Sequence, residues 1–170
     1  MSEAEFRAAL SRLASGVVLV TAHEPPLTED GPPGEDVGMT ATAFVSVSLE
    51  PPLVMLSVRE GSRMDDLLAE QPLWAASFLA EGQHGTAARF SMKNRISDRL
   101  LFADLDTTRG PLSGALLPTG ALASLECRTE SLIPTGDHTM VVARVLGASF
   151  PTGEADPLAY FRGRYRRLTG

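Results

Sequence analysis

Extended segments follow one another along this chain without a helix after each of them. Runs of β-branched residues or of alternating polarity, typical of strands, cover residues 16–22, 38–49, 53–58, 73–79, 121–133 and 138–150. The segment Pro134-Thr-Gly-Asp137 joins the last two and predicts a hairpin. Parallel strands need a crossover helix between them. This order therefore favours a mainly β fold, an antiparallel barrel or sandwich with accessory helices.

Four further segments carry helical patterns, and one long segment carries none. Helices are expected at residues 2–14, 62–68, 82–92 and 96–102. The first begins with a capping box of Ser2 and Glu5, followed by apolar residues that recur on one face. Residues 23–37 contain four prolines and two glycines. They predict a loop that is long for a compact domain.

The composition is that of a globular chain. Its 170 residues are 44% hydrophobic and 21% charged, and a single domain over residues 1–170 is expected. No apolar run approaches the ~20 residues of a membrane-spanning helix, and the acidic N-terminus is unlike a signal peptide, so a cytoplasmic protein is expected. The net charge of −6 argues against nucleic-acid binding. The lone Cys127 excludes an internal disulfide, and three scattered histidines predict no metal site.

The segment 38–52 is unusually rich in small and hydroxyl-bearing side chains. It reads G-M-T-A-T-A-F-V-S-V-S-L-E-P-P, where a strand against an oily core should carry large apolar residues at every second place. Small side chains let a flat ligand approach the backbone, and hydroxyls can bond its polar edge. The alternative is a tightly packed barrel strand whose Thr and Ser side chains bond to the backbone.

Two arginine-containing segments are candidates for an anion. Ser62 and Arg63 open a predicted helix, where free N–H groups and the helix dipole favour a phosphate. The alternative is an ordinary Ser N-cap followed by a surface charge. Four arginines between residues 162 and 167 form either a solvated basic strand or a site for an anionic ligand.

Five blocks of this sequence resemble the flavin reductase family. They occur in the family's order and cover nearly the whole chain. The blocks are Phe6-Arg7-x-Ala9-Leu10-x-x-x-Ala14-Ser15-Gly16-Val17, the segment 38–54, Gly120-Ala-Leu-Ala-Ser-Leu-Glu-Cys127, Gly136-Asp137-His138 and Tyr160-Phe161-Arg162-Gly163-Arg164-Tyr165. The resemblance implies an FMN-binding split β-barrel, usually a homodimer. It also implies reduction of FMN, with FAD possible, by NADH or NADPH, to supply reduced flavin to a separate monooxygenase.

The resemblance also implies roles for individual residues. Those expected to bind the flavin are Thr40, Ala41, Thr42, Ser46, Val47 and Ser48 along its ring, Ser62 and Arg63 at its phosphate, and Arg89 and Phe90 along the ribityl chain or ring. His138, Tyr160, Phe161 and Arg162 are expected on the nicotinamide side. His138 is the catalytic candidate, because a histidine could stabilise negative charge near flavin N1 and O2. Its alternative is a hairpin-tip histidine bonded to a turn.

Two departures and two rival functions accompany this interpretation. The loop at residues 23–37 is longer than usual for the family, and Thr42 stands where a serine is frequent, which keeps the hydroxyl and adds a methyl group. One rival is a flavin-binding split-barrel protein without reductase activity. The other is a split-barrel oxidase that acts on another substrate.

Overall fold

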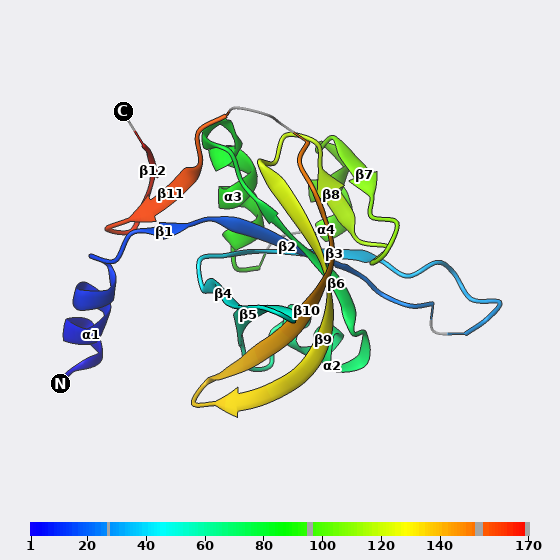
Figure 1. Cartoon of the computed structure of the whole chain (residues 1–170), viewed down its shortest axis with the longest axis horizontal. Coiled ribbons are helices and arrows are strands. Elements are labelled where there is room, and N and C mark those ends of the chain that lie inside the picture. The colour runs from blue at the N-terminus through cyan, green and yellow to red at the C-terminus, as the bar shows by residue number, and fades with distance from the viewer. Residues whose placement is uncertain (27, 95–96, 152–154, 169–170) are drawn as a thin grey trace.

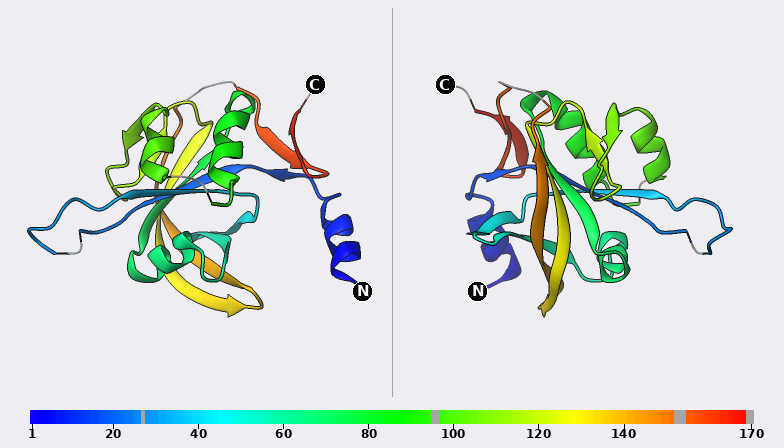
Figure 2. Two further views of the ribbon diagram at one scale, coloured as in Figure 1. Left: turned by 180° about the vertical axis from the view of Figure 1, so that it is seen from behind. Right: turned by 45° about the vertical axis from the view of Figure 1, so that its right-hand side comes forward.

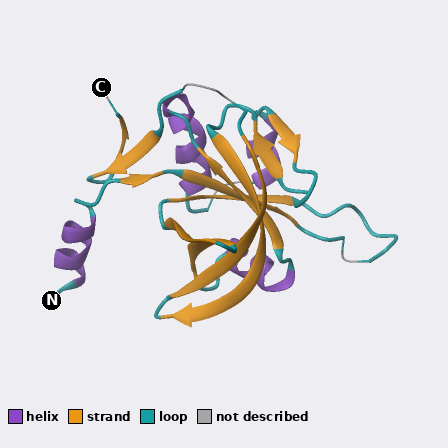
Figure 3. Ribbon diagram, viewed as in Figure 1, coloured by secondary structure: helices purple, strands orange, loops and turns teal. Residues whose placement is uncertain are grey.

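A computed structural model describes residues 1–26, 28–94, 97–151 and 155–168, and most of its strands form one antiparallel sheet (Figures 1 and 3). In spatial order the sheet is β3 (Asp36–Ala41), β2 (Val18–His23), β6 (Leu73–Phe78), β9 (Ala123–Thr135), β10 (His138–Ser149), β5 (Pro52–Arg59) and β4 (Phe44–Leu49). Every neighbouring pair is antiparallel. The mainly β, antiparallel fold with accessory helices is confirmed.

Two smaller sheets flank this one. The first joins β1 (Ser15–Gly16), β11 (Leu158–Phe161) and β12 (Arg164–Arg167), and the second pairs β7 (Thr107–Arg109) with β8 (Leu116–Pro118). The single strand expected at residues 16–22 is therefore wrong. Its start pairs with β11, whereas β2 pairs with β3 and β6. The chain changes sheets between the two, at Val17.

The hydroxyl-rich segment is also two strands rather than one. β3 ends at Ala41, a bend follows, and β4 begins at Phe44. The two strands lie at opposite edges of the seven-stranded sheet. Alternation along residues 38–49 could not reveal this break, because each strand finds its partners elsewhere in the chain: β3 pairs with β2, and β4 pairs with β5.

The helices are α1 (Glu3–Leu10), α2 (Arg63–Glu70), α3 (His84–Ser91) and α4 (Asp98–Ala103), with a 3-10 turn at Glu81–Gln83. The predicted capping box of α1 is present, with Ser2 Oγ accepting from Glu5 N at 3.2 Å and Ser2 N donating to Glu5 Oε2 at 2.7 Å. α1 ends earlier than expected. The fourth helix was expected from residue 96, which lies outside the described residues. No helix in the described part of the chain is long and apolar enough to cross a membrane.

The main core lies between the strands and α2. Trp74, Leu56 and Val141 are fully buried there, and Met64, Leu67 and Leu68 of α2 pack against the same cluster. Figures 1 and 2 show α1 at one side of the molecule and the loop between β2 and β3 projecting from the opposite side. Both features stand away from the sheet.

Cys127 lies in this core, and its thiol is expected to be inert. Burial, with a smaller contribution from the Glu126 charge, raises the pKa of Cys127 to about 12. The reactive thiolate is therefore nearly absent at pH 8. We expect the native protein to react with a disulfide reagent at least about tenfold more slowly than the urea-unfolded chain. Stoichiometric labelling of the native protein at the unfolded rate would contradict this.

Candidate functional site

A threonine side chain attaches the end of β3 to helix α3. Thr40 Oγ1 donates to the carbonyl of Ala87 in α3 at 2.8 Å, and Gly38 N donates to Asp98 Oδ2 at 2.9 Å. The hydroxyl hydrogen of Thr40 is therefore bonded to the backbone, as the alternative interpretation of this segment expected. A ligand could be bound only by the lone pairs of the Thr40 oxygen. Ala41 is half-buried, and Thr42 is exposed in the bend that follows.

β4 presents the remaining hydroxyl groups at an open edge of the sheet. It pairs on one side only, with β5, and a register shift between Ser46 and Ser48 leaves Val47 in a bulge. Val47 is 53% exposed. An apolar hollow of about 270 Å³ lies beside Phe44 at the start of the strand, with Phe78 in its wall. The hollow thus lies at the start of β4, and the hydroxyl groups lie further along the strand.

Ser62 and Arg63 lie where the sequence placed them, at the start of α2. Ser62 Oγ accepts from Asp65 N at 3.2 Å, so Ser62 is the N-cap of the helix. The Arg63 guanidinium contacts two carboxylates at the base of the β2–β3 loop, Glu24 and Glu35. The hydrogen bond to Glu35 is the main reason that the pKa of Arg63 is raised above its ordinary value.

Arg89 and Phe90 are neighbours in α3, but Arg89 lies at the surface and Phe90 lies in the core. Phe90 is 1% exposed, its ring centroid lies 4.8 Å from that of Phe102, and a Cβ at Gly38 would collide with it. The Phe90 ring therefore packs inside the protein and offers no surface to a flavin, contrary to expectation. Arg89 is partly exposed, with Asp104 at 3.8 Å.

His138 lies at the tip of the β9–β10 hairpin. Its Nδ1 is 2.7 Å from Asp137 Oδ1, and this hydrogen bond lowers the pKa of Asp137. The turn is tied to the segment before α2, because Glu60 N donates to the Asp137 carbonyl at 3.1 Å. His138 therefore lies at the same end of β5 as Ser62. It is bonded to a turn residue, as expected for a hairpin-tip histidine.

Tyr160 and Phe161 end β11, and Arg162 begins the turn to β12. Arg162 lies over the Phe161 ring at 5.2 Å, and Tyr160 packs edge-on against Tyr165 with ring centroids 5.4 Å apart. The Arg162 N–H donates to the Ser11 carbonyl, which attaches this turn to the end of α1. Figures 1 and 2 show the turn well separated from the tip of the β9–β10 hairpin. One chain does not bring these residues together with His138.

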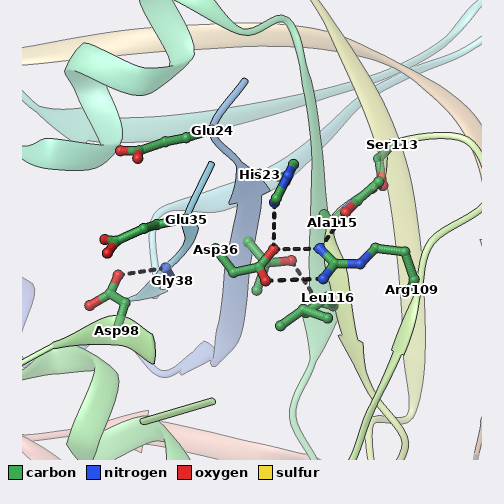
Figure 4. Close-up of polar contacts among 12 residues, drawn as sticks. His23, Glu24, Glu35, Asp36, Gly38, Asp98, Arg109, Ser113, Ala115 and Leu116 are labelled. Atoms are coloured by element: carbon green, nitrogen blue, oxygen red, sulfur yellow. Dashed lines mark hydrogen bonds and ion pairs between the residues drawn. The ribbon is translucent and has the colours of Figure 1, made fainter. Parts of the chain in front are cut away.

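An ion cluster that the sequence did not reveal closes the base of the long loop (Figure 4). Asp36 accepts from Arg109 Nη2 at 3.1 Å, and its other oxygen lies 3.0 Å from His23 Nδ1. Arg109 Nη1 also donates to the Gly114 carbonyl at 2.8 Å. Arg109 is far from Asp36 in sequence, so no local signal could pair them.

Comparison with known proteins identifies the class to which this fold and these motifs belong. The flavin reductase like domain family matches residues 10–169. The chain belongs to this family, as its five motif blocks predicted. The reductase component of 4-hydroxyphenylacetate 3-monooxygenase from Thermus thermophilus is 40% identical over 99% of this chain and 97% of its own length. An NADH-dependent flavin reductase from a Rhodococcus species is 38% identical over 96% of this chain and 85% of its own.

Solved structures agree with the sequence relatives. The flavin reductase component of a bacterial two-component tryptophan halogenase superposes with a TM-score of 0.87 at 32% identity, over 99% of both chains. An NADH:FAD oxidoreductase of Streptomyces globisporus, solved with NAD and FAD fragments, superposes with a TM-score of 0.86 at 32% identity, over 99% of this chain and 93% of its own.

Proposed function

We propose that this protein is an NAD(P)H-dependent flavin reductase. The observation that carries the proposal is the match along nearly the whole chain to proteins named as NADH-dependent flavin reductases. A bound flavin would supply the acceptor for a hydride from the nicotinamide, and the residues of the site would have to align the two rings. The reduced flavin serves a separate monooxygenase, as the names of several relatives indicate for those proteins. The cytoplasm is the proposed compartment.

The residues along β3 and β4 fit a flavin. The exposed hydroxyl groups of Thr42 and Ser46 and the half-buried one of Ser48 suit the polar edge of the ring, and the hollow beside Phe44 suits its apolar edge. Thr40 fixes the end of β3 by its bond to α3. Ser62 and Arg63 would hold the phosphate, and Arg89 would hold the ribityl chain. His138 would stabilise negative charge on the reduced ring.

An anaerobic assay tests the function. NADH or NADPH is mixed with FMN, and the visible absorption of oxidised flavin is followed with and without protein. We expect bleaching well above the protein-free rate with at least one nucleotide. Flavin binding without any bleaching would favour the binding protein that lacks reductase activity. No binding and no bleaching would contradict the flavin reductase and the flavin-binding protein alike.

We further propose that the protein works as a homodimer. α1 has no buried residue, and Phe6 and Leu10 on it and Leu13 just after it are all exposed large apolar side chains. The open edge of β4 adds Val47 to the exposed apolar surface. A two-fold partner would cover such surfaces. It would also supply a second β11–β12 turn, which lies far from His138 within one chain.

Replacing Leu10 by glutamate is expected to weaken this dimer. Leu10 is 52% exposed in the single chain, and its burial in the interface would stabilise the dimer. A glutamate at this position loses that contribution and buries a carboxylate, so the dimer dissociation constant should rise about tenfold or more. Sedimentation velocity over a range of concentrations measures the constant. The control is Leu100→Glu, because Leu100 on α4 is equally open at 58% exposure. Equal effects of the two substitutions would remove α1 from the interface.

A further inference from the structure

The base of the β2–β3 loop holds two carboxylates in fixed positions. Glu24 N donates to the Glu35 carbonyl at 2.8 Å, which closes the base of the loop. Gly34 packs so closely on Glu24 that a Cβ there would collide with the Glu24 carbonyl. Figure 4 shows the side chains of Glu24 and Glu35 pointing to the same side, away from the contacts of Asp36. The paired backbone therefore places both side chains at the base of the loop, where they point to the same side.

Both carboxylates converge on Arg63. Arg63 Nη2 lies 2.8 Å from Glu35 Oε2 and 3.1 Å from Glu24 Oε1, and Nε donates to the same Glu24 oxygen at 3.4 Å. Two full negative charges thus share one guanidinium. Because Arg63 directly follows the N-cap Ser62, these carboxylates stand beside the start of α2, the end of the helix that favours an anion.

The surroundings add further negative charge. A cavity of about 1130 Å³ runs along the loop and α2, and its lining includes five acidic residues against two arginines, Arg63 and Arg99. The acidic residues are Glu24, Glu35, Asp36, Asp66 and Glu70. An anion that approaches Arg63 must therefore displace carboxylates and enter a region with an excess of negative charge.

We propose that Glu24 and Glu35 are specificity-determining residues, which compete with the phosphate of a flavin for Arg63. This rests on the proposed function, in which Ser62 and Arg63 hold that phosphate. The competition reduces the affinity for phosphorylated flavins only, because riboflavin has no anion to place there. When the phosphate binds Arg63, the two carboxylates lose their cation, and the base of the loop loosens.

The decisive comparison is the affinity for FMN against that for riboflavin. The double variant Glu24→Gln, Glu35→Gln keeps the size of both side chains and removes both charges. We expect its FMN affinity to rise about tenfold, because Arg63 no longer has to leave two charged hydrogen-bond partners in order to bind the phosphate. Riboflavin affinity should stay within about twofold, since it presents no charge to the site. Fluorescence titration without nicotinamide measures both constants.

A matched control and a second measurement separate this inference from simpler explanations. Glu29→Gln removes a charge from the same loop, but Glu29 neither contacts Arg63 nor lines the cavity among the described residues, so the affinity ratio should not move. Hydrogen exchange at the Glu24 amide, which bonds to Glu35, should accelerate when FMN binds to the parent protein and not when riboflavin binds. The single variant Glu24→Gln repeats the titration if the double variant does not fold.

The outcomes are distinct. An FMN to riboflavin affinity ratio that stays unchanged in the double variant, or equal gains for both flavins, overturns the competition while leaving the reductase intact. A parent protein that binds neither flavin overturns the proposed function, and this inference with it. A ratio that shifts about tenfold toward FMN in the double variant but not in Glu29→Gln supports it.

Discussion

Replacing Arg63 by alanine is expected to weaken FMN binding by about 1.5–3 kcal/mol, the usual contribution of a hydrogen bond to a charged group. Riboflavin binding should barely change. The substitution removes the cation beside the start of α2 and leaves the carboxylates of Glu24 and Glu35 there without it. The phosphate then loses an attractive partner and meets two uncompensated negative charges. Titrations of the parent and the variant with FMN and with riboflavin measure the FMN to riboflavin affinity ratio, which should fall in the variant.

The maximal rate is expected to separate binding from chemistry. The phosphate is remote from flavin N5, and remote contacts that do not change during the reaction lower KM more than they raise kcat. With saturating FMN, Arg63→Ala should therefore keep a rate within about tenfold of the parent. Arg99→Ala is the control, because Arg99 lines the same cavity and is not placed at the phosphate. A ratio unchanged by Arg63→Ala would remove this residue from the flavin site.

Replacing Trp74 by alanine is expected to lower the free energy of unfolding by about 3–5 kcal/mol. Trp74, the second residue of β6, is 0% exposed and packs in the main core. Its indole N–H donates to Thr129 Oγ1 at 3.0 Å. The substitution leaves a large cavity that the surrounding strands can fill only partly. Urea unfolding followed by far-UV circular dichroism measures the loss, since Trp74 is the only tryptophan and its fluorescence disappears with it.

Two further substitutions divide this loss between packing and hydrogen bonding. Trp74→Phe keeps an aromatic ring and should cost less than the alanine variant. Thr129→Val leaves the buried indole N–H without its acceptor and should cost about 1–3 kcal/mol. If Trp74→Ala unfolds at the same urea concentration as the parent, the core around β6 contributes little to stability.

Features that depend on neighbouring residues could be predicted from the sequence. The capping box at Ser2, the N-cap at Ser62 and the hairpin around residue 136 all appear where local patterns predicted them. The order of the predicted strands indicated the antiparallel fold, and five ordered motifs predicted the family by resemblance. Local hydrogen bonding and side-chain periodicity decide such features, and both are visible within a few residues of sequence.

The contacts that each local feature makes depend on the three-dimensional arrangement of the chain. It divided the segment 38–49 between opposite edges of the sheet and placed the Phe90 ring in the core. It also paired Arg63 with carboxylates of the long loop, which the sequence showed only as an insertion. A pattern of polarity shows that a side chain is buried or charged. Its partner depends on which distant strands and loops the topology brings beside it, and for Arg63 that partner decides how strongly a phosphate can compete.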